Sequence, residues 1–159
     1  MTLAYIGLGS NLSDPAKQIT LAIKAIKLGV DGEVIATSSV YFSRPMGPQD
    51  QPDYTNAVLA LETNLTAIAL LDQLQALENA AGRVRKDNRW GARILDLDIL
   101  LFGNSIIKNE RLTIPHYGLK NREFVLIPLA EITHNYILPD GDNITTLSKN
   151  ITLNGLMKY

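Results

Sequence analysis

Apolar residues recur at two different spacings along this chain of 159 residues, and the first spacing predicts strands. A short apolar run over residues 3–9 is typical of a buried strand, and residues 33–42 and 54–62 alternate between apolar and polar side chains as strands do. Residues 94–102 form another apolar stretch, which the turn-forming pair Gly103 and Asn104 ends. These four segments are therefore expected to be strands.

The second spacing, of three to four residues, predicts helices between these strands. The first helix begins near Pro15, a residue that suits a first helical turn, and ends near Gly29. The second ends near Gly82, and residues 121–132 are expected to hold a short third helix. The apolar stripes of the first two helices are Ile19, Ile23 and Ile26, and Leu70, Leu71, Leu74 and Leu77.

The order of these elements, strand–helix–strand–strand–helix–strand, is typical of a ferredoxin-like α+β sandwich. In that α/β sandwich both helices cover one face of a mostly antiparallel sheet. The residues after Phe102 would add C-terminal elaborations to it. The length suits one domain, so residues 1–159 are expected to form a single domain.

Composition and charge exclude several classes of protein. Hydrophobic residues make up 46% of the chain, enough to fill a core, and the absence of cysteine removes disulfides and thiolate metal sites. The net charge of −1 is not that of a general nucleic-acid or membrane-surface binder. No apolar run approaches the ~18 residues of a membrane span, and residues 1–5 do not resemble a signal peptide. We therefore expect a cytoplasmic protein that binds neither nucleic acid nor membrane.

The segment 89–101 carries the most informative chemistry of the chain. Residues two apart in a strand share a face, so Asp96 and Asp98 are expected to point the same way, with Leu97 on the other side. Two buried carboxylates repel each other unless a cation binds both, and Mg²⁺ takes a few carboxylates, waters and substrate phosphates. The alternative is a solvent-facing acidic pair on an edge strand, since Asp-x-Asp is a short pattern.

Basic residues just upstream favour the metal site, and these residues are Arg83, Arg85, Lys86, Arg89 and Arg93. Guanidinium groups bind phosphate oxygens through paired hydrogen bonds, and phosphoryl transfer depends mostly on positioning and charge neutralisation. The alternative is a solvated basic loop. The glycines of residues 7–11 form no phosphate-binding P-loop, because no Gly-Lys-Ser/Thr follows, and alone they indicate a tight turn after the first strand.

Two aromatic residues and an asparagine are candidates for binding a flat heterocycle. Tyr54 and Asn56 share one face of a strand, where a ring can stack and an amide offers both a donor and an acceptor. Phe124 lies in an apolar stretch. Taken alone, each is better explained by packing or by a structural amide than by a ligand site. The two histidines, His116 and His134, match no zinc signature.

Together these stretches resemble the 6-hydroxymethyl-7,8-dihydropterin pyrophosphokinases over nearly the whole chain, and the segment 89–101 is the most specific shared motif. The other shared motifs are Gly9-Ser10-Asn11-Leu12, residues 47–56, Gly82-Arg83-Val84-Arg85, residues 111–117, Asn121-Arg122 and Phe124. The resemblance implies an elaborated ferredoxin-like fold. It also implies an enzyme of folate biosynthesis that transfers pyrophosphate from MgATP to 6-hydroxymethyl-7,8-dihydropterin and releases AMP.

The resemblance further implies roles for individual residues. Asp96 and Asp98 would bind two Mg²⁺ ions, and Arg83 and Arg93 would act with them in catalysis. The pterin would be held by Ser43, Pro45, Met46, Tyr54, Asn56, Trp90 and Phe124. ATP, the co-substrate, would be bound by Gln75, Glu78, Arg83, Arg85, Trp90, Arg93, Ile99, Arg111, Thr113, His116, Tyr117 and Arg122, in some cases through backbone groups.

The pterin loop differs in detail from the family pattern, because Arg44 and Met46 stand where Pro and Leu are frequent and Ser43 replaces a Thr. Two other functions stay open. One is an RNA-binding sheet, which the near-neutral charge disfavours, and the other is a nucleotidyltransferase, which would attach AMP to its substrate. The chain is expected to act as a monomer. Residues 83–93 are expected to form a lid that closes over both substrates, with Trp90 covering the pterin.

Overall fold

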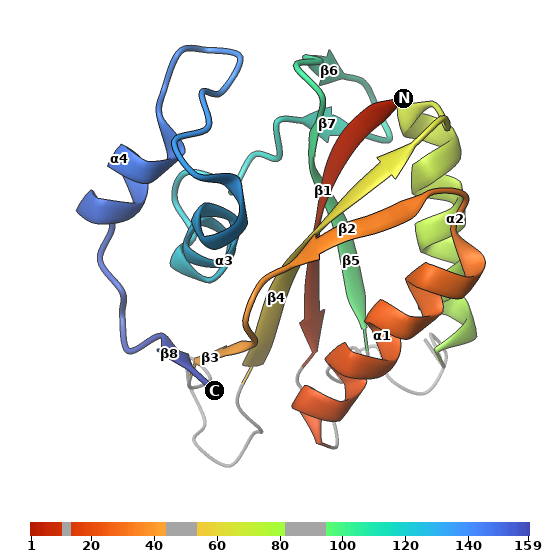
Figure 1. Ribbon diagram of the computed structural model, residues 1–159, viewed down its shortest axis with the longest axis horizontal. Helices are drawn as coiled ribbons and strands as arrows, with labels where there is room; N and C mark the ends of the chain where they lie inside the picture. Colours follow the sequence, from red (N-terminus) through yellow and green to blue (C-terminus); the bar gives the residue numbers. More distant parts are fainter. Residues whose placement is uncertain (11–13, 44–53, 82–94) are drawn as a thin grey trace.

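The computed structural model describes residues 1–10, 14–43, 54–81 and 95–159 (Figure 1). Its strands are β1 (Thr2–Ser10), β2 (Glu33–Thr37), β3 (Tyr41–Ser43), β4 (Tyr54–Thr63), β5 (Asp96–Phe102), β6 (Ile107–Lys108), β7 (Thr113–Ile114) and β8 (Met157–Lys158). Its helices are α1 (Pro15–Gly29), α2 (Ala67–Ala80), α3 (Glu123–Thr133) and α4 (Ile144–Asn150).

Within the described chain, six strands form one sheet in which every pairing is antiparallel. The strand order is β5-β1-β4-β3-β8, and β2 also pairs with β4. β6 and β7 pair separately as a short ribbon. The order of the elements and the antiparallel sheet confirm the predicted ferredoxin-like α+β fold, with β1 between β4 and β5.

The sheet separates two layers of helices (Figure 1). α1 and α2 pack on one face, as the apolar stripes predicted, and Ile19, Ile26, Leu70 and Leu74 are completely buried there. α3 and α4 lie on the other face, where Leu126 is completely buried. Each face of the sheet therefore has its own hydrophobic core, and the layer of α3 and α4 contains the third helix that the sequence predicted. No helix of the described residues combines the length and the hydrophobicity needed to cross a membrane.

The single strand predicted over residues 33–42 is wrong, because a break separates β2 from β3. At this break the Ser38 backbone N–H donates to the Val58 carbonyl at 2.8 Å, and Ser38 Oγ accepts from the Val58 N–H at 2.9 Å. A side-chain oxygen thus takes the place of a backbone carbonyl in the pairing with β4. Ser and Thr side chains compete with the strand ladder in this way, which is why alternation alone did not reveal the break.

A carboxylate on α3 ties that helix to the start of β3. Glu131 accepts hydrogen bonds from the Ser39 backbone N–H and Oγ, both at 2.9 Å, and from the Tyr41 hydroxyl. Partial burial raises the pKa of Glu131, but these donors and the charge of Lys158 outweigh it, so its pKa lies below the usual value. Burial and the adjacent carboxylate raise the pKa of the Tyr41 hydroxyl, which therefore stays a donor.

Replacing Glu131 by Gln should destabilise the fold most at neutral pH. A carboxylate whose pKa is lowered by folding contributes stability above its unfolded pKa of about 4.3, and the contribution disappears as the pH falls through the folded pKa. Gln keeps the shape without the charge, so we expect Glu131→Gln to lower the free energy of unfolding by about 1–2 kcal/mol at neutral pH. Urea unfolding at neutral pH and near pH ~3 measures the change, which should shrink in acid.

Glu110→Gln is the matched control, because Glu110 is exposed in the turn between β6 and β7. This surface change should alter the free energy of unfolding by less than about 0.5 kcal/mol at either pH. An equal destabilisation of Glu131→Gln in acid and at neutral pH would contradict the part assigned to the carboxylate charge.

Candidate active site

Three adjacent strands bring three of the predicted site residues, Asn56, Asp96 and Asp98, into two rows. In the antiparallel register, Gly9 of β1 lies between Asn56 of β4 and Asp96 of β5. In the next row on the same face, Gly7 lies between Val58 of β4 and Asp98 of β5. Alternate residues of a strand share a face, so both rows lie opposite the core formed with α1 and α2. The expectation that the two aspartates point the same way therefore agrees with the register.

A cavity of about 710 Å³ lies over these rows. Strands β1, β4 and β5 form its floor, and the beginning of α3 contributes a wall. The described residues that line it are Gly7, Leu8, Gly9, Ser43, Tyr54, Asn56, Ala57, Val58, Asp96, Asp98, Leu100, Arg122, Glu123, Phe124, Val125 and Asn154. The cavity therefore unites every described pterin candidate with both aspartates, and its size is typical of a small-molecule site.

Gly7 and Gly9 keep the floor of this cavity free of side chains. A Cβ on Gly9 would lie 3.2 Å from Asn56 Oδ1, whereas a Cβ on Gly7 would make only ordinary contacts of 3.4–3.6 Å with Leu100. The tight turn that these glycines indicated is wrong, because β1 continues through Ser10. Both glycines alternate with buried apolar residues in the sequence, and this alternation indicates a strand with the two glycines on one face.

Two aromatic rings line the cavity from different elements. Tyr54 begins β4 and is 43% exposed, and Phe124 lies in the first turn of α3. The guanidinium carbon of Arg122 lies 5.9 Å from the centre of the Phe124 ring, so a cation borders the same space. Two accessible rings beside the amide of Asn56 can hold a planar heterocycle by stacking and by hydrogen bonds to its edge.

Asp96 and Asp98 form a donor set that fits Mg²⁺. Both side chains line the cavity, Asp96 partly exposed and Asp98 exposed. Among the residues that the structure describes, no cluster of three or more His, Cys, Asp or Glu side chains forms a metal site made of protein alone. Mg²⁺ needs only one or two carboxylates when waters and substrate phosphates complete its octahedron, so the pair suits a metal that arrives with a nucleotide.

His116 is fixed against the edge of β5. Its backbone N–H donates to the Leu100 carbonyl at 3.0 Å, and its Nδ1 accepts from the Gly118 N–H at 3.0 Å. Burial lowers the pKa of His116, Asp98 opposes the shift and Arg122 adds to it. The ring is therefore neutral at physiological pH and carries its proton on Nε2, which makes it a hydrogen-bond donor.

Tyr117 connects this histidine to a cation. The rings of His116 and Tyr117 stack with their centroids 4.5 Å apart, and the Arg122 guanidinium carbon lies 4.9 Å from the centre of the Tyr117 ring. Arg122 Nη2 also donates to the Tyr117 hydroxyl at 3.3 Å. The three predicted ATP residues thus form one cluster, and its guanidinium borders the cavity, where it can bind phosphate oxygens.

Two other predicted ATP residues, Glu78 and Ile99, are buried. Glu78 of α2 is 7% exposed, and its Oε2 accepts a hydrogen bond from the Leu97 backbone N–H at 2.8 Å. Leu97 lies between the two aspartates, so this carboxylate fixes the backbone that carries them. The Ile99 side chain belongs to the core below α1 and α2, which leaves only its backbone for a ligand.

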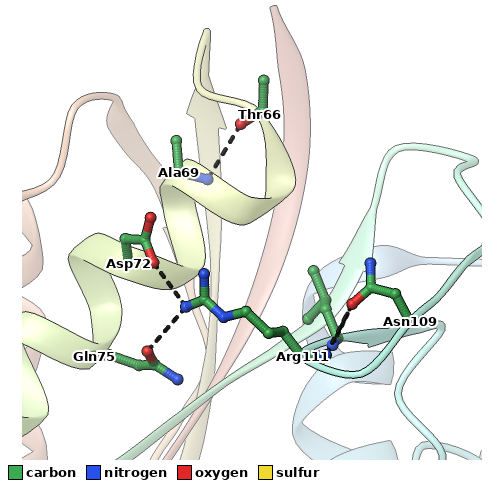
Figure 2. Close-up of polar contacts among 7 residues, drawn as sticks. Thr66, Ala69, Asp72, Gln75, Asn109 and Arg111 are labelled. Carbon is green, nitrogen blue, oxygen red and sulfur yellow. Dashed lines mark hydrogen bonds and ion pairs between the residues drawn. The ribbon is translucent and has the colours of Figure 1, made fainter.

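Arg111 and Gln75, both expected to bind the nucleoside, meet between α2 and the turn that joins β6 to β7 (Figure 2). Arg111 Nη2 donates to Gln75 Oε1 at 3.1 Å and to Asp72 Oδ1 at 2.7 Å. The Arg111 backbone N–H donates to Asn109 Oδ1 at 2.9 Å, which holds the turn. Exposed pairs of this kind contribute about 0–1 kcal/mol, so a ligand can redirect the guanidinium at little cost. Thr113 is exposed on the adjacent β7.

The sequence is similar to proteins named 2-amino-4-hydroxy-6-hydroxymethyldihydropteridine pyrophosphokinase. It is 54% identical over 158 residues to that of Haemophilus influenzae, covering 99% of this chain and 98% of the relative. It is 49% identical over 143 residues to that of Pseudomonas aeruginosa, covering 90% and 88%. The model of the 7,8-dihydro-6-hydroxymethylpterin-pyrophosphokinase (HPPK) family matches residues 5–134. This chain belongs to the HPPK family.

Solved structures with an HPPK domain share the fold at low sequence identity. A crystal structure of an HPPK-DHPS in complex with substrates superposes with a TM-score of 0.75 at 13% identity over 99% of this chain. Plasmodium falciparum HPPK-DHPS with pteroate superposes with a TM-score of 0.73 at 15% identity over 94% of this chain. The chain spans 46% and 42% of those two chains, so the likeness concerns the HPPK fold alone.

Part of the expected HPPK site lies outside the described residues, namely Pro45, Met46, Arg83, Arg85, Trp90 and Arg93. The lid predicted over 83–93 lies outside them as well. Conversely, the cavity includes Glu123 and Asn154, which the sequence did not single out. The sequence could have indicated Glu123 as a site residue, since it directly precedes the candidate Phe124 at the start of a predicted helix. No sequence pattern could have indicated Asn154, because only the folded path of the C-terminal segment brings it to the cavity.

Removing the Glu78 carboxylate should loosen the strand that carries the aspartates of this HPPK member. In Glu78→Ala the buried Leu97 N–H loses its hydrogen bond to Glu78, and an unsatisfied buried donor costs about 1–3 kcal/mol. We expect the free energy of unfolding to fall by that amount in urea titrations. Glu78→Gln keeps an acceptor of the same shape and should recover part of the loss. Wild-type stability of Glu78→Ala would show that the bond contributes nothing.

Proposed function

We propose that this chain transfers a pyrophosphoryl group from ATP to 6-hydroxymethyl-7,8-dihydropterin in folate biosynthesis, which makes it a transferase of the kinase type. The observation that carries the proposal is the 54% identity to a named pyrophosphokinase over 99% of the chain. The cavity supports it, because two carboxylates, a guanidinium and two aromatic rings border one space. A site with both a phosphate-binding half and a heterocycle-binding half suits this pair of substrates.

The reaction forms one bond and breaks one bond. The hydroxymethyl oxygen of the pterin attacks the β-phosphorus of ATP, and the bond from that phosphorus to the oxygen bridging the α- and β-phosphates breaks. AMP leaves with the bridging oxygen, and the hydroxyl proton is lost to solvent. Most of the barrier to such a transfer is lowered by positioning and by charge neutralisation, which is the work this site has to do.

The pterin would lie over the floor of the cavity. Tyr54 and Phe124 supply rings for stacking, and the Asn56 amide supplies a donor and an acceptor for the heterocycle edge. Ser43 lies at the end of β3, paired with Tyr54, and adds a hydroxyl to the same wall. Pro45, Met46 and Trp90 would complete this half of the site. The side-chain-free surface of β1 leaves room for a flat ring beside the amide.

Asp96 and Asp98 would hold two Mg²⁺ ions together with the ATP phosphates. Bound Mg²⁺ neutralises the phosphate charge and orients the reacting oxygens. The chain contributes the carboxylates on one strand face, at a spacing that the pairing with β1 fixes. Glu78 keeps that backbone in place through its bond to Leu97.

The nucleotide would lie beyond β5, between α2 and the segment that contains His116. The Nε2–H of neutral His116 and the guanidinium of Arg122 would donate to phosphate oxygens, with Tyr117 beside them. Arg83, Arg85, Arg93 and Trp90 would close over the phosphates, and Arg83 and Arg93 would neutralise the charge that develops on AMP. The nucleoside would contact Gln75, Glu78, Ile99, Arg111 and Thr113. Action as a cytoplasmic monomer stays a prediction from the sequence.

Product analysis tests the proposed function. Incubation with MgATP and 6-hydroxymethyl-7,8-dihydropterin should release AMP in equal amount to the pterin consumed, with the pyrophosphate attached to the pterin. Release of ADP would indicate transfer of a single phosphoryl group, and attachment of AMP to the pterin would indicate a nucleotidyltransferase. Either result, or the lack of pterin-dependent turnover, would overturn the proposal.

Asp98→Asn should lose activity by about 100-fold or more while it remains folded, because the charge that neutralises the transferring group is removed without a change of shape. The Mg²⁺ concentration for half-maximal rate should rise in parallel. Glu33→Gln is the control, since Glu33 is an exposed carboxylate on β2 of the same sheet. Near-normal turnover of Asp98→Asn at limiting Mg²⁺ would exclude a metal ligand at this position.

A further inference from the structure

The C-terminal segment of the chain is anchored beside the cavity. β8 pairs with β3, with Met157 opposite Phe42, and the Tyr159 backbone N–H donates to the Val40 carbonyl at 2.9 Å. The Phe42 and Tyr159 rings lie 4.8 Å apart between centroids, and Leu156 is buried. In Figure 1 the blue segment between α4 and β8 returns to the lower edge of the sheet, next to β3. The segment that precedes β8 therefore has a fixed path past the site.

A tight turn just before β8 presents Asn154. The Leu156 N–H donates to the Leu153 carbonyl at 2.9 Å, and the two central residues have positive φ, 51° at Asn154 and 83° at Gly155. Asn followed by Gly is the preferred pair for a turn that needs positive φ at both central positions. The backbone geometry alone therefore explains why an Asn is tolerated here, but it does not require the side-chain amide.

The Asn154 side chain lines the same cavity as Asn56 and Phe124. Its Nδ2 lies 3.4 Å from Glu123 Oε1, and Glu123 lines the cavity beside Phe124. A hydrogen bond of this length between exposed groups is weak, so a ligand can replace it. The amide and the carboxylate together offer one donor group and several acceptors at the wall of α3.

We propose that Asn154 contacts the pterin substrate directly and raises its affinity, with Glu123 as its partner. The proposal rests on the proposed function. A dihydropterin carries N–H donors and ring or carbonyl acceptors along more than one edge, so the Asn56 amide on the floor cannot satisfy all of them. Glu123 begins α3 and Asn154 lies in the turn before β8, whereas Asn56 is on β4, so the first two can bind an edge of the ring that faces α3.

This assignment extends the site beyond the residues that the family model matches. The family model matches residues 5–134, and Asn154 lies 20 residues after its end. The C-terminal segment thus adds a substrate contact to the pocket formed by β1, β4 and α3. Such a contact changes the affinity for the pterin, and the groups that neutralise phosphate charge are untouched.

The decisive variant is Asn154→Gly, because glycine adopts positive φ as readily as Asn while it removes the amide. Titration calorimetry measures pterin binding to the enzyme saturated with Mg²⁺ and a non-hydrolysable ATP analogue. We expect the pterin Kd to rise about five- to tenfold. The Kd of the ATP analogue, the thermal midpoint and kcat at saturating pterin should stay at wild-type values. Asn154→Asp, which loses the donor and adds a charge beside Glu123, should weaken pterin binding as well.

Asn150→Ala is the matched control, because the side chain of this exposed Asn on α4 donates to the Thr146 carbonyl of its own helix and does not line the cavity. It should bind the pterin as the wild type does. Wild-type pterin affinity in Asn154→Gly would overturn the inference, and so would a parallel loss of both ligands with a lower thermal midpoint. Failure of the wild-type enzyme itself to bind the pterin or to release AMP would instead overturn the proposed function, so the two failures are distinct.

Discussion

The antiparallel register of β4, β1 and β5 is the constraint on which the site depends. It places Asn56, Gly9 and Asp96 in one row, and a shift of one residue would turn every side chain of a strand to the opposite face. For β5 such a shift would bury two carboxylates against α1 and α2 and expose Leu97, at a cost of several kcal/mol for each ion. Packing on one face and polarity on the other therefore specify the same register.

The wall of the cavity that α3 forms depends on how this helix is held, through Glu131 within it and through Lys120 just before it. Its first turn carries Phe124, and Glu131, two turns later, binds Ser39 and Tyr41 at the start of β3. Because β3 also carries Ser43, one carboxylate keeps both the helix and the strand that border the cavity in a fixed relation. Lys120, just before α3, bonds to Asp140 and Asp142 of the following loop and ties the preceding segment down as well.

The sequence predicted the central fold because its helices and strands have strong periodicity. The stripe from Leu70 to Leu77 and the alternation around Asp96 each record burial on one face, and burial is what periodicity measures. It failed where side chains replace backbone groups, as Ser38 does between β2 and β3. It also failed where residues meet only through tertiary structure, because no local pattern relates Asn154 to a cavity formed by β1 and α3.

Within the candidate site, residue type was more informative than residue environment. The shared face of the paired aspartates follows from strand geometry, but their spacing also fits a solvent-facing pair, so the basic residues upstream were needed to favour a metal site. Glu78 illustrates the limit. Its presence on an amphipathic helix gave no sign that it would be buried with its carboxylate on the Leu97 N–H, since that contact requires α2 and β5 to be packed together.

The bare floor at Gly9 has a consequence for inhibition. A compound that contacts β1 there touches main-chain atoms, which no substitution can remove. The simplest way to block such a compound is to add a side chain at position 9, but a Cβ there would lie 3.2 Å from Asn56 Oδ1 and disturb the amide that the natural substrate would use. Resistance at this position would therefore impair the enzyme itself, which makes the strand floor a more durable target than the aromatic side chains around it.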